Sequence, residues 1–302
     1  MTSHKTVIAL GFFDGLHIGH AELLKRVFEV GWQNGATPTM MTFDTHPDEL
    51  VGRTAVPLLT SPDERAAIAG EYFGIENIIA LHFDEDIRRM PWQDFLEWLH
   101  EDFGAIGFVV GHDFRFGANA EGSADKLCQW VDQIRGTRDP RVSGYIVPAV
   151  TVDGEIVSST LIRKFLTEGD IERANRLLGR RHRVTDIVRS GYRLGRTIGA
   201  PTINMRFPKG VIVPKRGVYA TRLRIEDDPA LYRAVTNIGV RPTVSEREEV
   251  TIESYVLDFD RQVYGKRGRV EFERFIRPEQ NFKNLDELKL QIERDIQTVR
   301  AM

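Results

Sequence analysis

The sequence predicts two structural units in series: an α/β unit built on a parallel sheet, then a small β-barrel followed by a C-terminal helix. In the first part, apolar runs rich in β-branched residues alternate with segments of helical spacing, as in parallel sheets covered by helices. From about residue 181, short strands between Gly, Pro and charged turns dominate. The charge also changes there: residues 1–180 hold 17 Lys and Arg against 27 Asp and Glu, and residues 181–302 hold 24 against 17. We therefore expect domains at 1–180 and 181–302.

Within the first unit, proline near the start of two helical segments fits its preference for the first helical turn. The strands are expected at Thr6–Leu10, Pro38–Phe43, Asn77–Phe83, Gly107–Val110 and Tyr145–Val150. The helices are expected at Ala21–Val30, Pro62–Phe73, Trp92–Phe103 and Ser123–Ile134. Sheets of this kind bind ligands at the carboxyl ends of their strands. Two glycine-bearing loops follow strands there, GFFDGLHIGH from Gly11 and GHDFRFG from Gly111.

The loop GFFDGLHIGH leads into the first expected helix and predicts a nucleotide site. The start of a helix presents unpaired backbone N–H groups and the positive end of the helix dipole, which together favour a phosphate. His17 and His20 would add imidazole donors, and Gly19 has no Cβ to crowd a ligand. The alternative is an ordinary strand–helix turn with two surface histidines. The preceding Phe-Asp-Gly favours the nucleotide site.

In the second unit, five short strands and one helix are expected. The strands are Val184–Arg189, Gly217–Ile225, Tyr232–Asn237, Val250–Phe259 and Arg269–Phe275. Short, mostly antiparallel strands of this length predict a small barrel. The helix is expected at Leu285–Val299, where apolar residues recur along one stripe.

A second group of polar residues lies in this unit. Thr202 and Asn204 follow a Gly-rich loop and stand two apart, so on an extended strand they face the same side. Their oxygens could reach one cation, and Mg²⁺ favours oxygen ligands that are completed by water and phosphate. Glu253 lies between apolar residues in the middle of an expected strand. Its carboxylate is either on the solvent-exposed face of the sheet or has a role in the chemistry. Taken alone, these patterns also occur in ordinary β proteins.

Composition narrows the function classes. The formal charge is −3, and the basic residues of the second half are scattered rather than clustered, so we expect no nucleic-acid partner. Cys128 is the only cysteine, which excludes an intrachain disulfide and a cysteine-based zinc site. No segment predicts a membrane span or a signal peptide, so a cytoplasmic protein is expected. The sequence does not fix the number of copies, and a homo-oligomer is compatible with it.

Taken together, the motifs resemble those of the bacterial bifunctional riboflavin kinase/FMN adenylyltransferase family, also called FAD synthetase. The resemblance covers almost the whole chain. In the first half it rests on GFFDGLHIGH, FDTHP (43–47), LLTSPDER (58–65), GHDFRFG (111–117) and VSSTLIRKFLTEGD (157–170). In the second half it rests on GRTIGAPTIN (195–204), VPKRGVYA (213–220), NIGVRPTV (237–244), IESYVLDF (252–259) and YGKRGRVEFERFIRPEQNF (264–282).

The resemblance implies a Rossmann-like nucleotidylyltransferase fold with an HxGH motif in the first domain, which would adenylylate FMN with ATP to give FAD and pyrophosphate. His17, His20 and Arg163 would then be catalytic, holding the ATP phosphates. The nucleotide-binding residues it implies are Gly11, Phe12, Asp14, Gly19, Ser159 and Thr160. The flavin-binding candidates are His46, Asp113 and Phe114. A class I aminoacyl-tRNA synthetase, which also carries an HIGH motif, is set aside because the chain lacks a KMSKS loop.

For the second domain the resemblance implies a riboflavin kinase barrel that uses ATP and Mg²⁺ to make FMN from riboflavin. Thr202 and Asn204 would hold the Mg²⁺, and Glu253 would be the general base. A flap over the nucleotide would contain Gly195, Arg196 and Gly199. ATP, riboflavin, FMN and FAD are therefore the small molecules expected to bind.

Several positions depart from the family pattern. Ala200 and Ile203 alter the GFPTAN motif, Thr45 alters FDTHP, and residues 118–120 (Ala-Asn-Ala) replace basic residues that often follow GHDFRFG. Asp186 stands where a Gly is common, and its carboxylate is expected to repel ATP phosphates. The alternatives to a bifunctional enzyme are thus an adenylyltransferase with an impaired kinase half, or a flavin-binding regulator.

Overall fold

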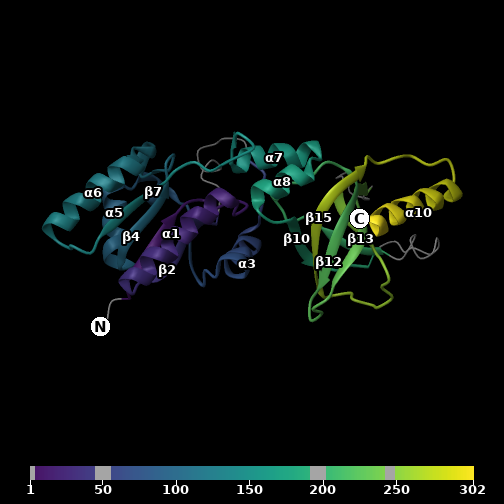
Figure 1. Ribbon diagram of the computed structural model, residues 1–302, viewed down its shortest axis with the longest axis horizontal. Coiled ribbons are helices and arrows are strands. Elements are labelled where there is room, and N and C mark those ends of the chain that lie inside the picture. Colours follow the sequence, from purple (N-terminus) through teal and green to yellow (C-terminus); the bar gives the residue numbers. More distant parts are fainter. Residues whose placement is uncertain (1–3, 45–55, 191–201, 242–248) are drawn as a thin grey trace. The chain divides into compact units, whose positions relative to one another are not determined.

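The computed structural model describes residues 4–44, 56–190, 202–241 and 249–302. The chain divides into two compact units, one formed by residues 1–57 and 62–158 and the other by residues 58–61 and 159–302 (Figure 1). Two helices, α7 (Ser159–Glu168) and α8 (Ile171–Leu178), therefore belong to the second unit, where α8 packs against strand β15 (Arg267–Arg277). This division lies before the expected domain boundary at residue 180.

The first unit has a five-stranded parallel sheet, as the alternating pattern predicts. Its strands lie in the order β3 (Asn77–Leu81), β2 (Thr37–Phe43), β1 (Thr6–Leu10), β4 (Ala105–Gly111) and β7 (Ser143–Val147). β1 is central and buried along its whole length. Because β1, β2 and β4 run in parallel, the loops that follow them leave from the same edge of the sheet.

Helices cover both faces of this sheet, and β1 divides its side chains between them. Val7 and Ala9 pack into one core with helix α1 (Ile18–Asn34) and helix α3 (Pro62–Phe73). Ile8 and Leu10 pack into the other core, which includes helix α5 (Trp92–Asp102) and helix α6 (Ala124–Thr137). The α/β fold class predicted for this half is confirmed. The smaller elements are α4 (Glu85–Arg89), η1 (Ala118–Ala120), β5 (Arg115–Phe116), β6 (Gly122–Ser123), β8 (Thr151–Val152) and β9 (Glu155–Ile156).

The second unit is a six-stranded antiparallel sheet that curls strongly. Its order is β10 (His182–Ile187), β15, β12 (Gly217–Ile225), β13 (Leu231–Arg241), β14 (Glu249–Val256) and β11 (Thr202–Arg206). The two edge strands meet where the amide of Arg189 donates to the carbonyl of Asn204 at 2.8 Å. The curled sheet agrees with the expected small barrel.

Helix α10 (Leu285–Ala301) lies beside β13 (Figure 1). Its apolar stripe divides along its length. Val299 is buried against Val218 and Val235 of the sheet, whereas Leu285 at the start of the helix is 52% exposed. The C-terminal part of the stripe therefore completes a core, and its N-terminal part remains open.

His182, at the start of β10, is a buried histidine that must stay neutral. Its side chain is 3% exposed, and its ring lies against the ring of Phe272, with 5.8 Å between centroids. Burial, together with the nearby charge of Arg180, lowers the pKa of His182 to about 3.

We expect the second unit to lose stability in acid because of His182. Below about pH 6.5, the ordinary histidine pKa, the unfolded chain binds a proton that the folded chain refuses. Stability is therefore complete above pH 6.5 and falls as pH drops toward 3; the loss between pH 7 and pH 5 is about 2 kcal/mol. Hydrogen exchange of β10 and β15 amides measures it without interference from the first unit, and His182→Gln is the control. Equal acid sensitivity in the two proteins would contradict the assignment.

Candidate active sites

The loop between β1 and α1 turns sharply through three residues with positive φ. These are Phe13 (φ 55°), Gly15 (φ 79°) and Leu16 (φ 43°). Only the glycine adopts this backbone without strain, and strained non-glycine residues gather at functional sites. Phe13 and Leu16 are fully buried, so packing holds them in this conformation. The turn brings the chain from the end of the central strand directly to the first turn of α1.

The two histidines of the motif lie together at the start of α1. His17 is the N-cap residue, and its Nδ1 accepts the backbone N–H of His20 at 3.3 Å. The two rings stack, with 3.6 Å between centroids and 14° between planes. Because Nδ1 of His17 acts as an acceptor, the proton of a neutral ring is on Nε2, which is then a hydrogen-bond donor. The predicted position of the pair at a helix start is confirmed.

Gly19 lies in close contact with the histidine beside it. A Cβ at this position would lie 3.1 Å from Nδ1 and Cε1 of His17, so the imidazole would have to shift slightly to accommodate a side chain. The role of Gly19 in admitting a ligand stays a prediction. The carbonyl oxygen of Val157 lies 4.0 Å from the same point. The segment that carries SSTLIR thus reaches the HxGH turn at residue 157.

Arg65, for which the sequence suggested no role, anchors this loop. Its Nη1 donates to Thr42 Oγ1 at 2.8 Å and to the carbonyl of Phe43 at 2.9 Å, and Thr42 donates to the carbonyl of Phe12 at 2.7 Å. The guanidinium also lies 4.5 Å from the ring centre of Phe12. Arg65 is 1% exposed, and burial lowers its pKa, an effect that the carboxylate of Asp14 opposes. The motif LLTSPDER contained the residue, but only the tertiary structure reveals its burial.

The flavin-binding candidates are only partly within the described residues. Phe114 is half-buried, and its ring stacks on Phe116 at 5.5 Å. The side chain of Asp113 is 83% exposed. His46 lies outside the described residues. Assignment of all three to the flavin stays a prediction.

The SSTLIR motif forms the start of α7 in the second unit. Ser159 and Thr160 stand in the first helical turn, and Arg163 follows one turn later. Residues four apart lie on the same side of a helix, so Ser159 and Arg163 share a face. The arrangement is suited to phosphate because the hydroxyls, the helix N-terminus and a guanidinium lie close together.

Glu253 lies in the middle of the curled sheet, between two asparagines on neighbouring strands. In the register of the sheet it stands opposite Asn204 of β11 and opposite Asn237 of β13. Thr202 is two residues from Asn204 and therefore faces the same side. The sheet thus brings the three predicted kinase residues together. Asn237, which no sequence argument singled out, joins them because register places it there.

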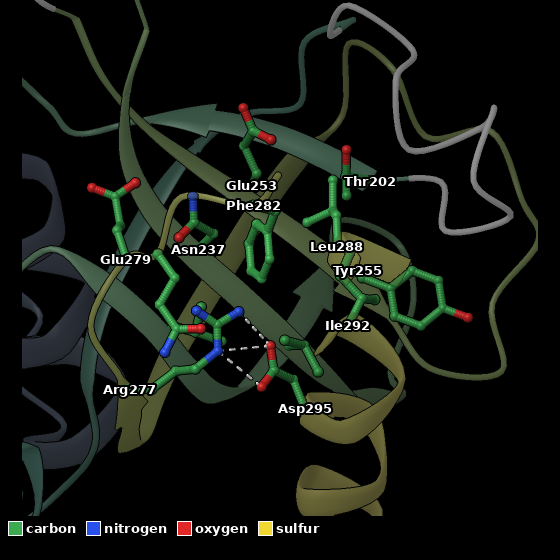
Figure 2. A pocket seen from close by; sticks show the side chains of 13 residues that line it. Thr202, Asn237, Glu253, Tyr255, Arg277, Glu279, Phe282, Leu288, Ile292 and Asp295 are labelled. Carbon is green, nitrogen blue, oxygen red and sulfur yellow. Dashed lines mark hydrogen bonds and ion pairs between the residues drawn. The ribbon is translucent and has the colours of Figure 1, made fainter. Parts of the chain in front are cut away.

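A pocket of about 300 Å³ opens on this face (Figure 2). The strands supply one wall, which includes Thr202 and Glu253, and the C-terminal segment supplies the other. Its lining residues are Thr202, Val218, Val235, Asn237, Glu253, Tyr255, Arg277, Glu279, Gln280, Phe282, Leu288, Ile292 and Asp295. Asn204 does not line it and is 5% exposed. The apolar and aromatic members suit a flat ring system, and the polar members suit hydroxyl groups.

A second pocket, of about 340 Å³, shares Thr202 with the first. Phe259 and Tyr264 are its aromatic lining residues, and Arg261 is its basic one. The Arg261 guanidinium lies 5.1 Å from the ring centre of Phe259. Thr202 therefore stands where two ligands in neighbouring pockets could meet.

Asp186 is neutralised locally. Its carboxylate forms an ion pair with Arg189 and accepts the backbone N–H of Arg206 at 2.8 Å. An unpaired carboxylate at residue 186 would repel the phosphates of ATP most strongly. The positive charge of Arg189 beside Asp186 weakens that repulsion. The flap residues Gly195, Arg196 and Gly199 lie outside the described residues, as does Ala200.

Two family models match the chain. The model described as FAD synthetase covers residues 1–161, and the model described as riboflavin kinase covers residues 178–302. The first carries the HxGH turn, and the second carries both pockets.

Curated relatives match along nearly the whole chain. A bifunctional riboflavin kinase/FMN adenylyltransferase of Listeria monocytogenes is 32% identical over 99% of this chain and 93% of its own. Those of Bacillus subtilis and Escherichia coli K12 are each 33% identical, over 97% of this chain and 91% of theirs.

One solved structure is similar over the full length of the chain. A crystal structure of a Streptococcus pneumoniae protein described as a macrolide-efflux protein superposes with a TM-score of 0.87 at 28% identity, covering 100% of this chain and 96% of that one. Within the residues that the structure describes here, no helix is long and apolar enough to cross a membrane.

The hydrogen bond by which His17 caps helix α1 can be tested separately from any catalytic role of His17. Loss of the acceptor in His17→Ala should cost about 1 kcal/mol of the first unit's stability, whereas His17→Asn keeps a good N-cap and should cost far less. Urea unfolding followed by tryptophan fluorescence measures this, since all four tryptophans lie in the first half. If the two variants were equally destabilised, the capping role would be wrong.

Proposed function

Because the chain belongs to the bifunctional riboflavin kinase/FMN adenylyltransferase family, it phosphorylates riboflavin to FMN and adenylylates FMN to FAD, and we propose that each reaction has its own site. Kinase chemistry takes place at the Glu253 pocket and adenylylation at the HxGH turn. The observation that carries this assignment is the cross-strand pairing of Glu253 with Asn204 and Asn237, in which Glu253 and Asn237 line a pocket of suitable size for a flavin.

In the kinase site, riboflavin occupies the pocket of Figure 2 with its ribityl 5′-hydroxyl at Glu253. Glu253 accepts the hydroxyl proton as the oxygen attacks the γ-phosphorus of ATP. The new O–P bond forms while the bond to the β,γ-bridging oxygen breaks, and ADP leaves. Proton transfer need only keep pace with phosphoryl transfer, so a carboxylate of ordinary basicity suffices.

ATP occupies the second pocket, with Thr202 at the junction between nucleotide and flavin. The hydroxyl of Thr202 and the amide oxygen of Asn204 supply oxygen ligands of the type that Mg²⁺ prefers. Among the described residues, no group of three or more His, Cys, Asp or Glu could hold a metal ion unaided. The remaining ligands would therefore be phosphates and water. Bound there, Mg²⁺ neutralises phosphate charge during transfer.

In the adenylyltransferase site, the FMN phosphate attacks the α-phosphorus of ATP, and pyrophosphate leaves. Positioning and electrostatic stabilisation supply most of the catalysis in such transfers. His17 offers its Nε2–H to the phosphates, with His20 stacked on it and the N-terminus of α1 behind both. Ser159, Thr160 and Arg163 stay phosphate-binding candidates at the start of α7, and Gly11, Phe12, Asp14 and Gly19 shape the nucleotide-binding turn in this proposal. His46, Asp113 and Phe114 stay flavin-binding candidates.

ATP as a co-substrate of both reactions, and a single cysteine in the chain, favour the cytoplasm as the compartment. The partners are small molecules, and nothing in the proposal requires nucleic acid or a second chain.

Glu253→Ala should abolish formation of FMN from riboflavin and leave conversion of supplied FMN to FAD within twofold. The base is lost from one site and the other site is untouched. Chromatographic separation of riboflavin, FMN and FAD after incubation with ATP and Mg²⁺ measures both rates. The adenylylation rate is the built-in folding control. Loss of both activities from a folded protein would refute separate sites.

His20→Ala should give the reverse result, with FMN accumulating and no FAD. His17→Asn separates the capping role from chemistry, because the helix cap survives while the imidazole is lost. We expect FMN-to-FAD conversion to fall by at least a hundredfold in His17→Asn, the scale on which one phosphate-stabilising donor acts. Near-normal FAD formation by this variant would show that His17 is only structural.

A further inference from the structure

The turn between β12 and β13 carries an aspartate whose side chain is fixed from three directions. Asp228 Oδ1 accepts a hydrogen bond from the backbone N–H of Ala230 at 3.0 Å, and Oδ2 accepts one from the hydroxyl of Tyr232 at 2.9 Å. The Nη2 group of Arg261 donates to the same Oδ2. These contacts, of which the bond from Ala230 is the largest, lower the pKa of Asp228 to about 2, so the carboxylate is charged at neutral pH.

Arg261, the residue that this aspartate holds, lines the pocket that shares Thr202 with the flavin pocket. Its Nη2 also donates to the hydroxyl of Tyr232. Its guanidinium lies 5.1 Å from the ring centre of Phe259 and 5.7 Å from that of Tyr232, and these two rings pack edge to face. One end of the guanidinium is therefore fixed, while the side chain as a whole is 56% exposed and accessible to a ligand.

Arg261 lies away from the end of this pocket at which phosphoryl transfer is proposed. In the register of the sheet, Thr202 pairs with Tyr255, which pairs with Val235 of β13. Tyr232, which Arg261 contacts, lies three residues from Val235 along the same strand, about 10 Å at the usual rise. β13 and β11 are also separated by β14, so about 10 Å lies between them across the sheet. With the γ-phosphate beside Thr202, Arg261 is closer to the nucleoside of ATP.

The charge and the neighbours of Arg261 also favour the nucleoside. An arginine that binds phosphates presents its positive charge and its fork of donors to them. The charge of Arg261 is balanced by the ion pair with Asp228, and its planar group lies beside two aromatic rings. A planar cation of this kind stacks on flat ring systems and donates hydrogen bonds at their edges. These surroundings suit a base and a ribose better than a chain of phosphates.

We propose that Arg261 binds the nucleoside end of ATP in the kinase site, and that Asp228 is a positioning residue that orients Arg261 for this contact. The inference rests on the proposed function, in which ATP occupies this pocket. Tyr232 assists, because its hydroxyl is bonded to both partners. The reacting phosphorus lies at the other end of ATP, so this contact stabilises the ground state and the transition state equally. Its loss should raise the KM of ATP without lowering kcat.

The test is the rate of riboflavin phosphorylation by the full chain, with γ-labelled ATP so that label on the flavin counts this reaction alone. In Arg261→Gln we expect the KM of ATP to rise about tenfold, the scale of one hydrogen bond from a charged donor. The kcat and the KM of riboflavin should change by less than about twofold. Arg274→Gln is the matched control, because Arg274 is also exposed and ion-paired, with Glu172, and lines neither pocket. An unchanged KM of ATP in Arg261→Gln would overturn the proposal.

Inhibition by adenosine, which has no phosphate, identifies the end of ATP that Arg261 contacts. The Ki of adenosine, measured in competition with ATP, should rise in Arg261→Gln by the same factor as the KM of ATP. A raised KM of ATP with an unchanged Ki of adenosine would mean that the guanidinium binds the phosphates, and the proposal would fail. It would also fail if adenosine did not compete with ATP in the unmodified chain, because the nucleoside would then contribute no binding.

Asp228→Asn tests the positioning role, because it keeps the shape of the side chain and removes its charge. We expect the KM of ATP to rise about threefold with kcat unchanged. If Asp228 acts only through Arg261, the double variant Asp228→Asn/Arg261→Gln should have the same KM of ATP as Arg261→Gln alone. Additive effects in the double variant would overturn the positioning role. An unmodified chain that makes no FMN from riboflavin would instead refute the proposed function.

Discussion

The alternation of side chains along a β-strand is the constraint on which both units depend. In β1 it sends Val7 and Ala9 to one core and Ile8 and Leu10 to the other, so the strand must be apolar throughout. In β14 the same alternation divides roles instead. Ile252, Ser254 and Val256 are buried, and Glu253 and Tyr255 line the pocket. One geometric rule thus gives the first unit its two cores and the second unit its pocket-lining face.

The turn after β1 shows how packing supports chemistry. Phe13 and Leu16 hold backbone conformations that cost energy, and their complete burial offsets that cost. Thr42 of β2 donates to the carbonyl of Phe12, and Arg65 of α3 donates to the hydroxyl of Thr42, so hydrogen bonds connect the loop to both elements. His17 caps α1, and its ring lies in close contact with the position that a Cβ of residue 19 would occupy. His17 and His20 are therefore placed by the same contacts that stabilise the loop.

The fold class and part of the candidate kinase site could be predicted from the sequence, because local patterns determine them. The alternation of apolar strand segments with helical segments predicted the parallel sheet and its helices. The spacing of Thr202 and Asn204, two residues apart, predicted that they share a face of the sheet. What depends on register or tertiary burial could not be foreseen. Asn237 meets Glu253 only through strand pairing, and Asp295 meets Arg277 although it lies 18 residues further along the chain. The ion pair of Asp186 with Arg189, three residues further along the chain, was likewise not foreseen, and the expected repulsion of ATP phosphates stays a prediction.

The central claim is that riboflavin phosphorylation and FMN adenylylation take place at two separate sites on one chain. Mixing Glu253→Ala protein with His20→Ala protein tests it most directly, since each retains only one of the two sites. Given riboflavin, ATP and Mg²⁺, the mixture should form FAD after a lag that shortens as the His20→Ala concentration rises. Failure of the mixture to form FAD, while each protein still performs its own single reaction, would contradict the account.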